Sequence, residues 1–204
     1  MDVAGKRPPI ETKSPSAADL PILIDILSSA FQTEPTFTFI IPGDEERRRR
    51  LPKAFDIFAR QDMQKGRVFM TAGGEAATMW RTPGQIKDSH WDGIKTAIPF
   101  LSAFGGAIAR GGRVAGSVTK HLPTEPCWYL HFAACKPEFQ GNGYGGAAIR
   151  AGLAAVDAGN AKAYLETADA VNLPVYRALG FELIKDWQVP GGPKFWGMMR
   201  PARG

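Results

Sequence analysis

The spacing of apolar residues predicts helices at the start and in the middle of the chain. From residue 20 to residue 31, apolar side chains recur every three or four positions, which predicts an amphipathic helix preceded by a capping box at Ser16. A second helix is predicted from Asp44, because acidic residues fill its first turn, where the helix dipole favours negative charge. Residues 86–118 show helical spacing broken by proline and glycine, so we expect several short helical pieces there.

Short apolar runs predict the strands. Residues 67–71 and 76–80 flank a Gly-Gly pair and predict a hairpin. Residues 127–135 are apolar almost without interruption, as in a buried strand. The run 163–167 follows a helical pattern, and a strand, helix and strand in this order predict a right-handed crossover between parallel strands. Residues 182–200 hold two runs around a Pro-Gly-Gly-Pro turn, which predicts a closing hairpin.

A glycine-rich turn, residues 136–146, joins the buried strand to the following helix. Glycines let backbone N–H groups approach a ligand, and the free N–H groups at a helix start favour an anion such as a phosphate. Gly141, Gly143 and Gly145 match neither the dinucleotide fingerprint G-x-G-x-x-G nor the P-loop, which requires a following Lys-Ser/Thr. On the loop alone, a turn that binds nothing is the alternative.

Two spaced motifs carry a resemblance to a known family. Gln140, Gly143 and Gly145 form Gln-x-x-Gly-x-Gly between a strand and a helix, which resembles the pyrophosphate loop of the GNAT superfamily of acyl-CoA N-acyltransferases. Asn172-x-x-x-Tyr176 follows in the order and at the separation of the family's later signature. The resemblance implies an α/β GNAT fold: a mixed, mostly antiparallel sheet, with central parallel strands splayed at a bulge, flanked by helices.

The resemblance covers nearly the whole chain. Within the superfamily, Glu125-Pro126-x-Trp128 and Leu165-Glu166-Thr167 are similar to the branch of puromycin N-acetyltransferases and their uncharacterised relatives. The similarity is thinnest in the N-terminal half, where that branch builds its acceptor pocket. We therefore expect the branch without assuming puromycin as the substrate.

The resemblance implies transfer of an acetyl group from acetyl-CoA to the primary amine of a small molecule, by direct attack through a tetrahedral intermediate. A strand N–H near Ala134 is the expected oxyanion donor. The residues implied in binding the cofactor are the strand residues Ala133, Ala134 and Cys135 along the pantetheine arm, the loop residues Gln140, Gly141, Asn142, Gly143, Tyr144 and Gly145 at the pyrophosphate, and Asn172.

Three residues are candidates for proton transfer. By resemblance Tyr176 protonates the leaving thiolate, although a tyrosine pKa of ~10 exceeds that of a thiol, ~8.5, so the site must help. Packing beneath the cofactor is its alternative role. Glu166 is the preferred general base, because burial raises a carboxyl pKa. His131 is the second candidate; the period-two rule places it on one face with Ala133 and Cys135, and a lone strand histidine is commonly structural.

Composition and charge fit one ordinary soluble domain. The chain has 204 residues, of which 44% are apolar and 22% charged, and its net charge of +5 suits an anionic cofactor. The run Arg47–Arg50 indicates either a nucleic-acid patch or a solvated helix face paired with the preceding acids. We favour the helix face and expect no nucleic-acid partner, because no aromatic residues interleave the arginines. No His, Cys and carboxylate group has metal-site spacing, so no metal is expected.

The domain organisation expected is a flexible tail, residues 1–8, and a single acetyltransferase domain, 9–204, with its cofactor half at about 124–204. Residues 9–13 could form a short first strand. No apolar run approaches ~18 residues and no secretory signal is visible, so we expect a cytoplasmic protein without a membrane contact. Cys127 and Cys135 would lie about 26 Å apart on one strand, which excludes a disulfide.

Some alternatives stay open from the sequence. The acceptor could be a peptide or protein amine, and the chain could be a catalytically silent CoA-binding module; an enclosed aromatic cleft would favour a small molecule. Residues 33–43, rich in proline and aromatic residues, are predicted as a loop that is either an active-site wall or a connector. A monomer or homodimer is expected, with the strand 194–200 either pairing across a dimer or forming the sheet edge.

Overall fold

The computed structural model describes residues 9–87 and 90–203, and within 90–96 only the backbone. The predicted tail 1–8, residues 88–89 of the helical stretch and Gly204 lie outside the described residues. The helices are α1 (Leu20–Ala30), α2 (Pro35–Ile40), α3 (Asp44–Lys65), α4 (His90–Phe104), α5 (Ile108–His121), α6 (Tyr144–Ala158) and α7 (Leu173–Ala178). The strands are β1 (Thr12–Lys13), β2 (Gly66–Thr71), β3 (Ala76–Arg81), β4 (Trp128–Cys135), β5 (Ala163–Thr167), β6 (Glu182–Gln188) and β7 (Lys194–Arg200).

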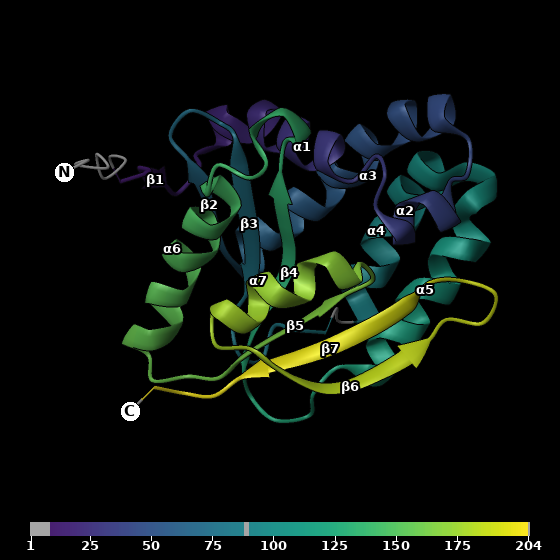
Figure 1. Cartoon of the computed structure of the whole chain (residues 1–204). Helices are drawn as coiled ribbons and strands as arrows, with labels where there is room; N and C mark the ends of the chain where they lie inside the picture. The colour runs from purple at the N-terminus through teal and green to yellow at the C-terminus, as the bar shows by residue number, and fades with distance from the viewer. Residues whose placement is uncertain (1–8, 88–89, 204) are drawn as a thin grey trace.

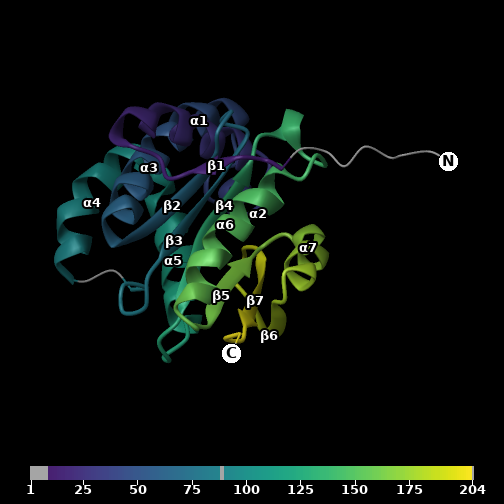
Figure 2. The same cartoon turned by 90° about the vertical axis from the view of Figure 1, so that its left-hand side faces the viewer.

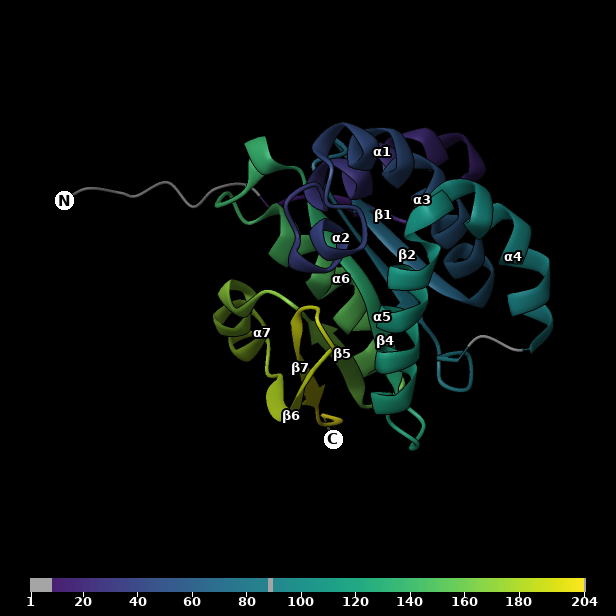
Figure 3. The ribbon, with the colours of Figure 1, turned by 90° about the vertical axis from the view of Figure 1, so that its right-hand side faces the viewer.

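The strands form one seven-stranded sheet in the order β1-β2-β3-β4-β5-β7-β6. Only β4 and β5 pair in parallel, as the crossover through α6 requires; the other described pairs are antiparallel. Helices α1, α3, α4 and α5 lie on one side of the sheet and α6 on the other (Figures 1, 2 and 3). The predicted mixed, mostly antiparallel α/β fold is confirmed.

A bulge at His131 separates two parts of β4. Leu130 pairs with Trp80 and Phe132 pairs with Met79, so His131 is the extra residue on β4. Strand β5 pairs with β4 only through residues 128–129, and beyond them the two strands share no register. The predicted bulge and splay are therefore confirmed, and the edge of β4 that faces β5 stays open.

The bulge also overturns one prediction about side-chain direction. His131 contacts Asp62 on α3, and Phe132 packs on the same side of the sheet. Ala133 instead packs with the cluster beneath α6, and the Cβ of Cys135 lies 3.6 Å from where a Cβ on Gly145 would stand. The expectation that His131 shares a face with Ala133 and Cys135 is wrong, because the inserted residue resets the period-two alternation.

Helix α6 lies unusually close to the sheet. A Cβ built on Gly152 of α6 would lie 2.1 Å from Nε1 of Trp80, a fully buried side chain on β3. The Trp80 indole N–H donates to Thr78 Oγ1 at 3.0 Å, and Thr78 donates to the Ala148 carbonyl on α6. This close packing fixes the position of α6 relative to β3.

Residues 35–40, in the middle of the segment 33–43, form helix α2, so the predicted loop is wrong for that part. Glu34 caps α2: its Oε2 accepts hydrogen bonds from the backbone N–H groups of Thr36 at 2.8 Å and Phe37 at 3.1 Å. Pro35 occupies the first helical position, where its missing N–H has no effect on the helix. Proline here starts a helix, whereas the sequence interpretation took it as a break.

The last strand is interior. Strand β7 pairs with β5 on one side and with β6 on the other, so β6 forms this end of the sheet. Arg200 in β7 is 2% exposed and pairs with the carboxylate of Asp157 on α6 at 2.6 and 2.9 Å. The prediction that 194–200 is an edge or a dimer-pairing strand is wrong, because β7 lies between β5 and β6 in the sheet.

The arginine run serves the fold more than expected. Arg47 is 4% exposed and donates to the carbonyls of Gln32, Ile41 and Pro42, which ties α3 to the segment before it. Arg50 pairs with Glu46 and donates to the Ala103 carbonyl. Arg48 and Arg49 are exposed, so the solvated face is confirmed for these two, and the expected pairing with the preceding acids is confirmed at Arg47–Asp44 and Arg50–Glu46. In the described part of the chain, no helix combines the length and the hydropathy needed to cross a membrane.

Candidate active site

The glycine-rich turn ends at the first turn of α6. Gly143 is the N-cap with φ +88°, and Gly141 has φ +76°, both in the left-handed region that favours glycine. The first backbone bond of the helix runs from Ala147 N to Gly143 O at 2.9 Å. The N–H groups of residues 144–146 therefore lie outside the helical ladder, at the positive end of a fifteen-residue helix.

The loop side chains brace this turn. Gln140 donates to the Cys135 carbonyl at 3.3 Å, and Asn142 donates to the Gln140 carbonyl at 3.2 Å. A Cβ on Gly141 would meet nothing within 4 Å, so the space over the backbone is open. Open N–H groups in a braced loop fit a diphosphate such as that of CoA.

The open edge of β4 leads from this loop into the molecule. Ala134 is buried, while Ala133 and Cys135 are half-buried beside the splay. Burial raises the pKa of the Cys135 thiol, and the Gly145 N–H only partly offsets it. A thiol kept protonated does not fit a nucleophile, so Cys135 contributes to this slot as a strand residue.

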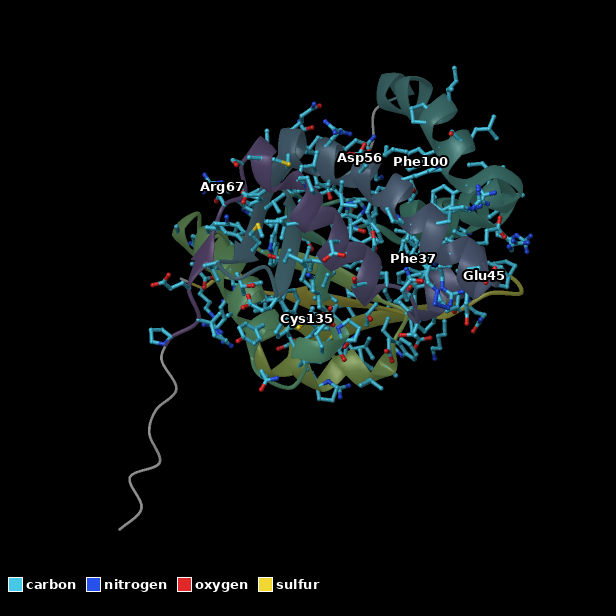
Figure 4. All side chains as sticks on the ribbon, turned by 90° about the horizontal axis from the view of Figure 1, so that it is seen from above. Phe37, Glu45, Asp56, Arg67, Phe100 and Cys135 are labelled. Atoms are coloured by element: carbon cyan, nitrogen blue, oxygen red, sulfur yellow. The ribbon has the colours of Figure 1, made fainter. Side chains whose placement is uncertain are left out.

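A cavity of about 560 Å³ opens beyond the splay, lined by residues of helices α2–α5 and α7 and of strands β3, β4, β5 and β7. Its volume lies in the usual range for small-ligand pockets. In the view from above, Phe37 and Phe100 lie among these helices, and Cys135 lies apart from them (Figure 4). Seven phenylalanines line it: Phe31, Phe37, Phe58, Phe100, Phe104, Phe132 and Phe195.

Glu166 on β5 lines the same cavity. The Tyr129 hydroxyl donates to its Oε1, while its Oε2 is buried and has no hydrogen-bond partner among the described residues. Burial raises the pKa of Glu166 to about 7, although Tyr129, Tyr164 and nearby cations lower it. A carboxylate that titrates near neutral pH can accept a proton from a bound group and release it again.

His131 belongs to a buried charged cluster beneath the cavity. Asp62 on α3 accepts from His131 Nδ1 at 2.6 Å and from Arg81 Nε at 2.7 Å. Burial raises the pKa of Asp62, but the charges of His131 and Arg81 outweigh it and hold the pKa low. The Asp62 carboxylate fixes the orientation of the His131 ring, whose proton positions follow from this network.

Tyr176 and Asn172 close the cavity on the side of α7. Tyr176 is 9% exposed and lines the cavity, and Asn172 stands at the N-cap of α7. Burial, together with the charges of Glu166 and Glu34, raises the pKa of Tyr176. The phenol therefore stays protonated at neutral pH, but its raised pKa also makes it a weaker acid, so the free protein does not provide the help that proton transfer to a thiolate needs.

The structure brings part of the predicted set together. Tyr176, Glu166, His131, Asn172 and Ala133 line one cavity. The loop residues 140–145 do not line it and lie at the other end of the β4 slot. Sequence reasoning missed Asp62, Tyr129 and Glu34, which reach the cavity or its catalytic candidates from distant positions. Only Glu34-Pro35, an N-cap followed by an N1 proline, carried a local signal.

The acetyltransferase (GNAT) family profile matches residues 74–181, more than half of the chain. The chain belongs to the GNAT acetyltransferase family. Members of the family are enzymes that transfer acetyl groups. The matched range runs from the β2–β3 turn to the end of α7 and includes the glycine-rich loop, Glu166 and Tyr176. The narrower resemblance to the puromycin N-acetyltransferase branch stays a prediction.

Solved structures share the fold over nearly the whole chain. A Corynebacterium glutamicum structure described as histone acetyltransferase HPA2 and related acetyltransferase is 24% identical, with a TM-score of 0.73 and coverage of 96% of this chain and 98% of that one. Arylalkylamine N-acetyltransferase 2 from Aedes aegypti is 12% identical, with a TM-score of 0.64 and coverage of 95% and 99%. Polyamine N-acetyltransferase from Drosophila melanogaster is 16% identical, with a TM-score of 0.54 and coverage of 93% and 98%.

The described side chains that could bind a metal ion do not gather into a site. Among residues 9–87 and 90–203, no three His, Cys, Asp or Glu side chains come together in a way that could hold a metal ion. Asp62 is instead occupied by a guanidinium and an imidazole.

Proposed function

We propose that this enzyme transfers an acetyl group from acetyl-CoA to the primary amine of a small molecule. The observation that carries the proposal is one cavity, at the end of the splayed β4 edge, that is lined by both a carboxylate with a pKa of about 7 and a protonated buried tyrosine. Transfer needs a proton acceptor and a proton donor on either side of the reacting carbonyl.

Acetyl-CoA is assigned to the β4 edge and the start of α6. The N–H groups of the loop 140–145 would hold the diphosphate, residues 133–135 the pantetheine arm, and Asn172 the same arm from the side of α7. A backbone N–H near Ala134, on the strand edge that β5 leaves open, is the proposed oxyanion donor.

Proton transfer is assigned to two side chains. Glu166 accepts the proton of the attacking amine, directly or through a water molecule, and Tyr176 donates a proton to the departing CoA thiolate. His131, oriented by Asp62, is the second candidate base. Holding amine and thioester together supplies much of the rate in any case, since effective molarity contributes ~7–11 kcal/mol.

The shape of the cavity favours a small molecule over a peptide. Its walls come from helices α2–α5 and α7 and from four strands, and seven phenylalanines line it. A protein substrate would instead need a shallow groove that admits a chain on both sides of the amine. A silent CoA-binding module is disfavoured because binding the cofactor does not call for a buried carboxylate such as Glu166 in the cavity beyond it.

The first experiment is thermal unfolding with acetyl-CoA. A ligand at 100 times its dissociation constant adds about 2.7 kcal/mol to the free energy of unfolding. Replacement Gly143→Val should abolish this stabilisation, because valine disfavours φ +88° and its side chain covers the loop backbone. Gly84→Val is the matched control: Gly84 has φ +85° in open space away from the loop, so this variant pays similar strain and keeps the acetyl-CoA shift.

The second experiment measures free CoA thiol with a panel of primary amines. Amine-dependent thiol release that disappears in Glu166→Gln supports N-acetyl transfer. Acetyl-CoA binding without thiol release on any small amine or peptide would instead support the silent module.

A further inference from the structure

We infer that the acceptor is a primary amine carried on an aromatic body, with a single positive charge. This inference rests on the proposed function and names its substrate class. It follows from how apolar rings and charges are distributed along the cavity.

A continuous aromatic wall forms one part of the cavity. The Phe58 ring lies 5.1 Å from that of Phe100 and 5.2 Å from that of Phe132, measured between ring centroids. Phe104 extends the wall at 6.0 Å from Phe100, and Phe31 extends it at 5.6 Å from Phe132. Phe31, Phe58, Phe100 and Phe132 are only partly buried, so ring surface is left for a ligand. Another aromatic ring packs favourably at such separations.

The cavity also presents two carboxylates. Glu34 and Glu166 both line it, from α2 and β5, and the charges of both act on the Tyr176 hydroxyl. The Glu34 carboxylate is held in place by Thr36, whose hydroxyl donates to Oε1 at 2.8 Å and whose N–H donates to Oε2. Fixed carboxylates beside a tyrosine form a site for one ammonium group, the protonated form in which an amine arrives.

The rest of the lining is unsuited to a second cation. The Arg81 guanidinium reaches the cavity already paired with Asp62, so this pair offers no free carboxylate to a second ammonium group. Beyond the carboxylates, α4 and α5 contribute phenylalanine, aliphatic side chains and glycine. A diamine or polyamine would place its second charge against these apolar residues, which costs binding energy.

Helix α5 makes room for the acceptor at Gly111. A Cβ on Gly111 would lie 3.9 Å from Ile40 and 4.0 Å from Phe104, so a larger side chain there projects into the space beside the aromatic wall. Gly116 stands on the same helix, is exposed, and meets nothing within 4 Å. The same substitution can therefore be made at Gly111, inside the cavity, and at Gly116, outside it, as a control.

The test compares kcat/KM for 2-phenylethylamine, 1,4-diaminobutane, ethylamine and a short peptide with a free N-terminus. For the unmodified enzyme we expect 2-phenylethylamine to exceed each of the others by at least about tenfold. Gly111→Leu should raise KM for 2-phenylethylamine by about tenfold or more and change KM for ethylamine by less than about threefold. Gly116→Leu should match the unmodified enzyme with both.

A second variant tests the ammonium site. Glu34→Gln keeps an oxygen that can cap α2 and removes the charge. We expect 2-phenylethylamine to bind at least about tenfold more weakly, measured by calorimetry, and the uncharged 2-phenylethanol to bind as before. Equal weakening of both ligands would show that Glu34 serves only the fold of α2 and would overturn its assignment.

The outcomes separate this inference from the proposed function. Efficient acetylation of the diamine or the peptide, with 2-phenylethylamine poor, overturns the aromatic acceptor and leaves N-acetyl transfer standing. Failure of 2-phenylethylamine to bind overturns it without any turnover measurement. Absence of thiol release with all amines, despite acetyl-CoA binding, overturns both.

Discussion

The two ends of the candidate site are formed by different parts of the polypeptide, main chain at one end and side chains at the other. The cofactor end, at residues 140–146, is exposed main chain at the start of α6, with glycines that keep side chains away. The acceptor end is a cavity walled by side chains from five helices and four strands. A backbone recognises a diphosphate whatever the side chains are, whereas a side-chain cavity changes its ligand with each substitution. The contrast explains how proteins only 12–24% identical can share this fold while their names specify different acceptors.

The largest expected effect separates catalysis from cofactor binding. Glu166→Gln should lower kcat by about 10²–10⁴-fold, because general-base catalysis contributes on that scale, and leave the acetyl-CoA dissociation constant unchanged. In the unmodified enzyme kcat should rise with pH through about 7, the pKa of Glu166, and this rise should be lost in the variant. Glu182→Gln, an exposed site on β6, is the control. A pH profile unaltered in Glu166→Gln would transfer the role of base to His131.

A smaller effect is expected at the leaving group. Tyr176→Phe should lower kcat by about 10²-fold, at the low end for a proton donor, because a thiol of pKa ~8.5 can depart unprotonated. Stopped-flow measurement of acetyl transfer would separate this step from product release. If Tyr176 only packs beneath the cofactor, the loss appears in the KM for acetyl-CoA and kcat stays within about threefold.

The buried cluster beneath the acceptor end should govern stability. Asp62→Asn leaves the charges of Arg81 and His131 without their buried carboxylate, and breaking such a pair typically costs about 3–5 kcal/mol. The melting temperature should fall by roughly 6–20 °C at 2–4 °C per kcal/mol. Asp56→Asn on the same helix removes an exposed pair with Arg60, and a shift as large as that of Asp62→Asn would contradict this account.

The smallest effect is the pH dependence of stability that comes from Glu166. The pKa of Glu166 is about 7 in the folded state, and its ordinary value of 4.5 applies to the unfolded state. Between these two pH values the folded state therefore binds more protons than the unfolded state. The contribution of Glu166 to stability is therefore complete below pH 4.5 and is lost as pH rises through 7, by no more than about 3 kcal/mol. Urea unfolding of Glu166→Gln and the unmodified enzyme at pH 5 and pH 8 should show the variant gaining relative stability at pH 8. A difference that does not change with pH would rule this out.

The glycine-rich loop and its place at the start of α6 could be predicted from the sequence because their signals are local. Gly143 and Gly145 lie in one turn between a strand and a helix. Glycine at such positions indicates either a positive φ, as at Gly143, or a backbone left open by the missing side chain. The parallel crossover and the splay at β4 followed from the same stretch and from the family resemblance.

The acceptor end could not be predicted, because its contacts join distant positions. Asp62 meets His131 across 69 residues, and Tyr129 meets Glu166 across 37. The bulge at His131 determines on which face of the sheet the β4 side chains lie. No spacing rule in the sequence locates the bulge at this residue. Pro35 illustrates the other difficulty: the same residue type breaks one helix and begins another, depending on the cap before it.

The interior place of β7 bears on how the protein is made. The ribosome delivers β5 and β6 first, and neither has its main antiparallel neighbour until residues 194–200 emerge. Until then the carbonyl and N–H groups of both strands lie open to other chains, a condition that promotes misassembly of nascent proteins. The strand that carries Glu166 is thus completed late in synthesis, after the loop for the cofactor has already been made.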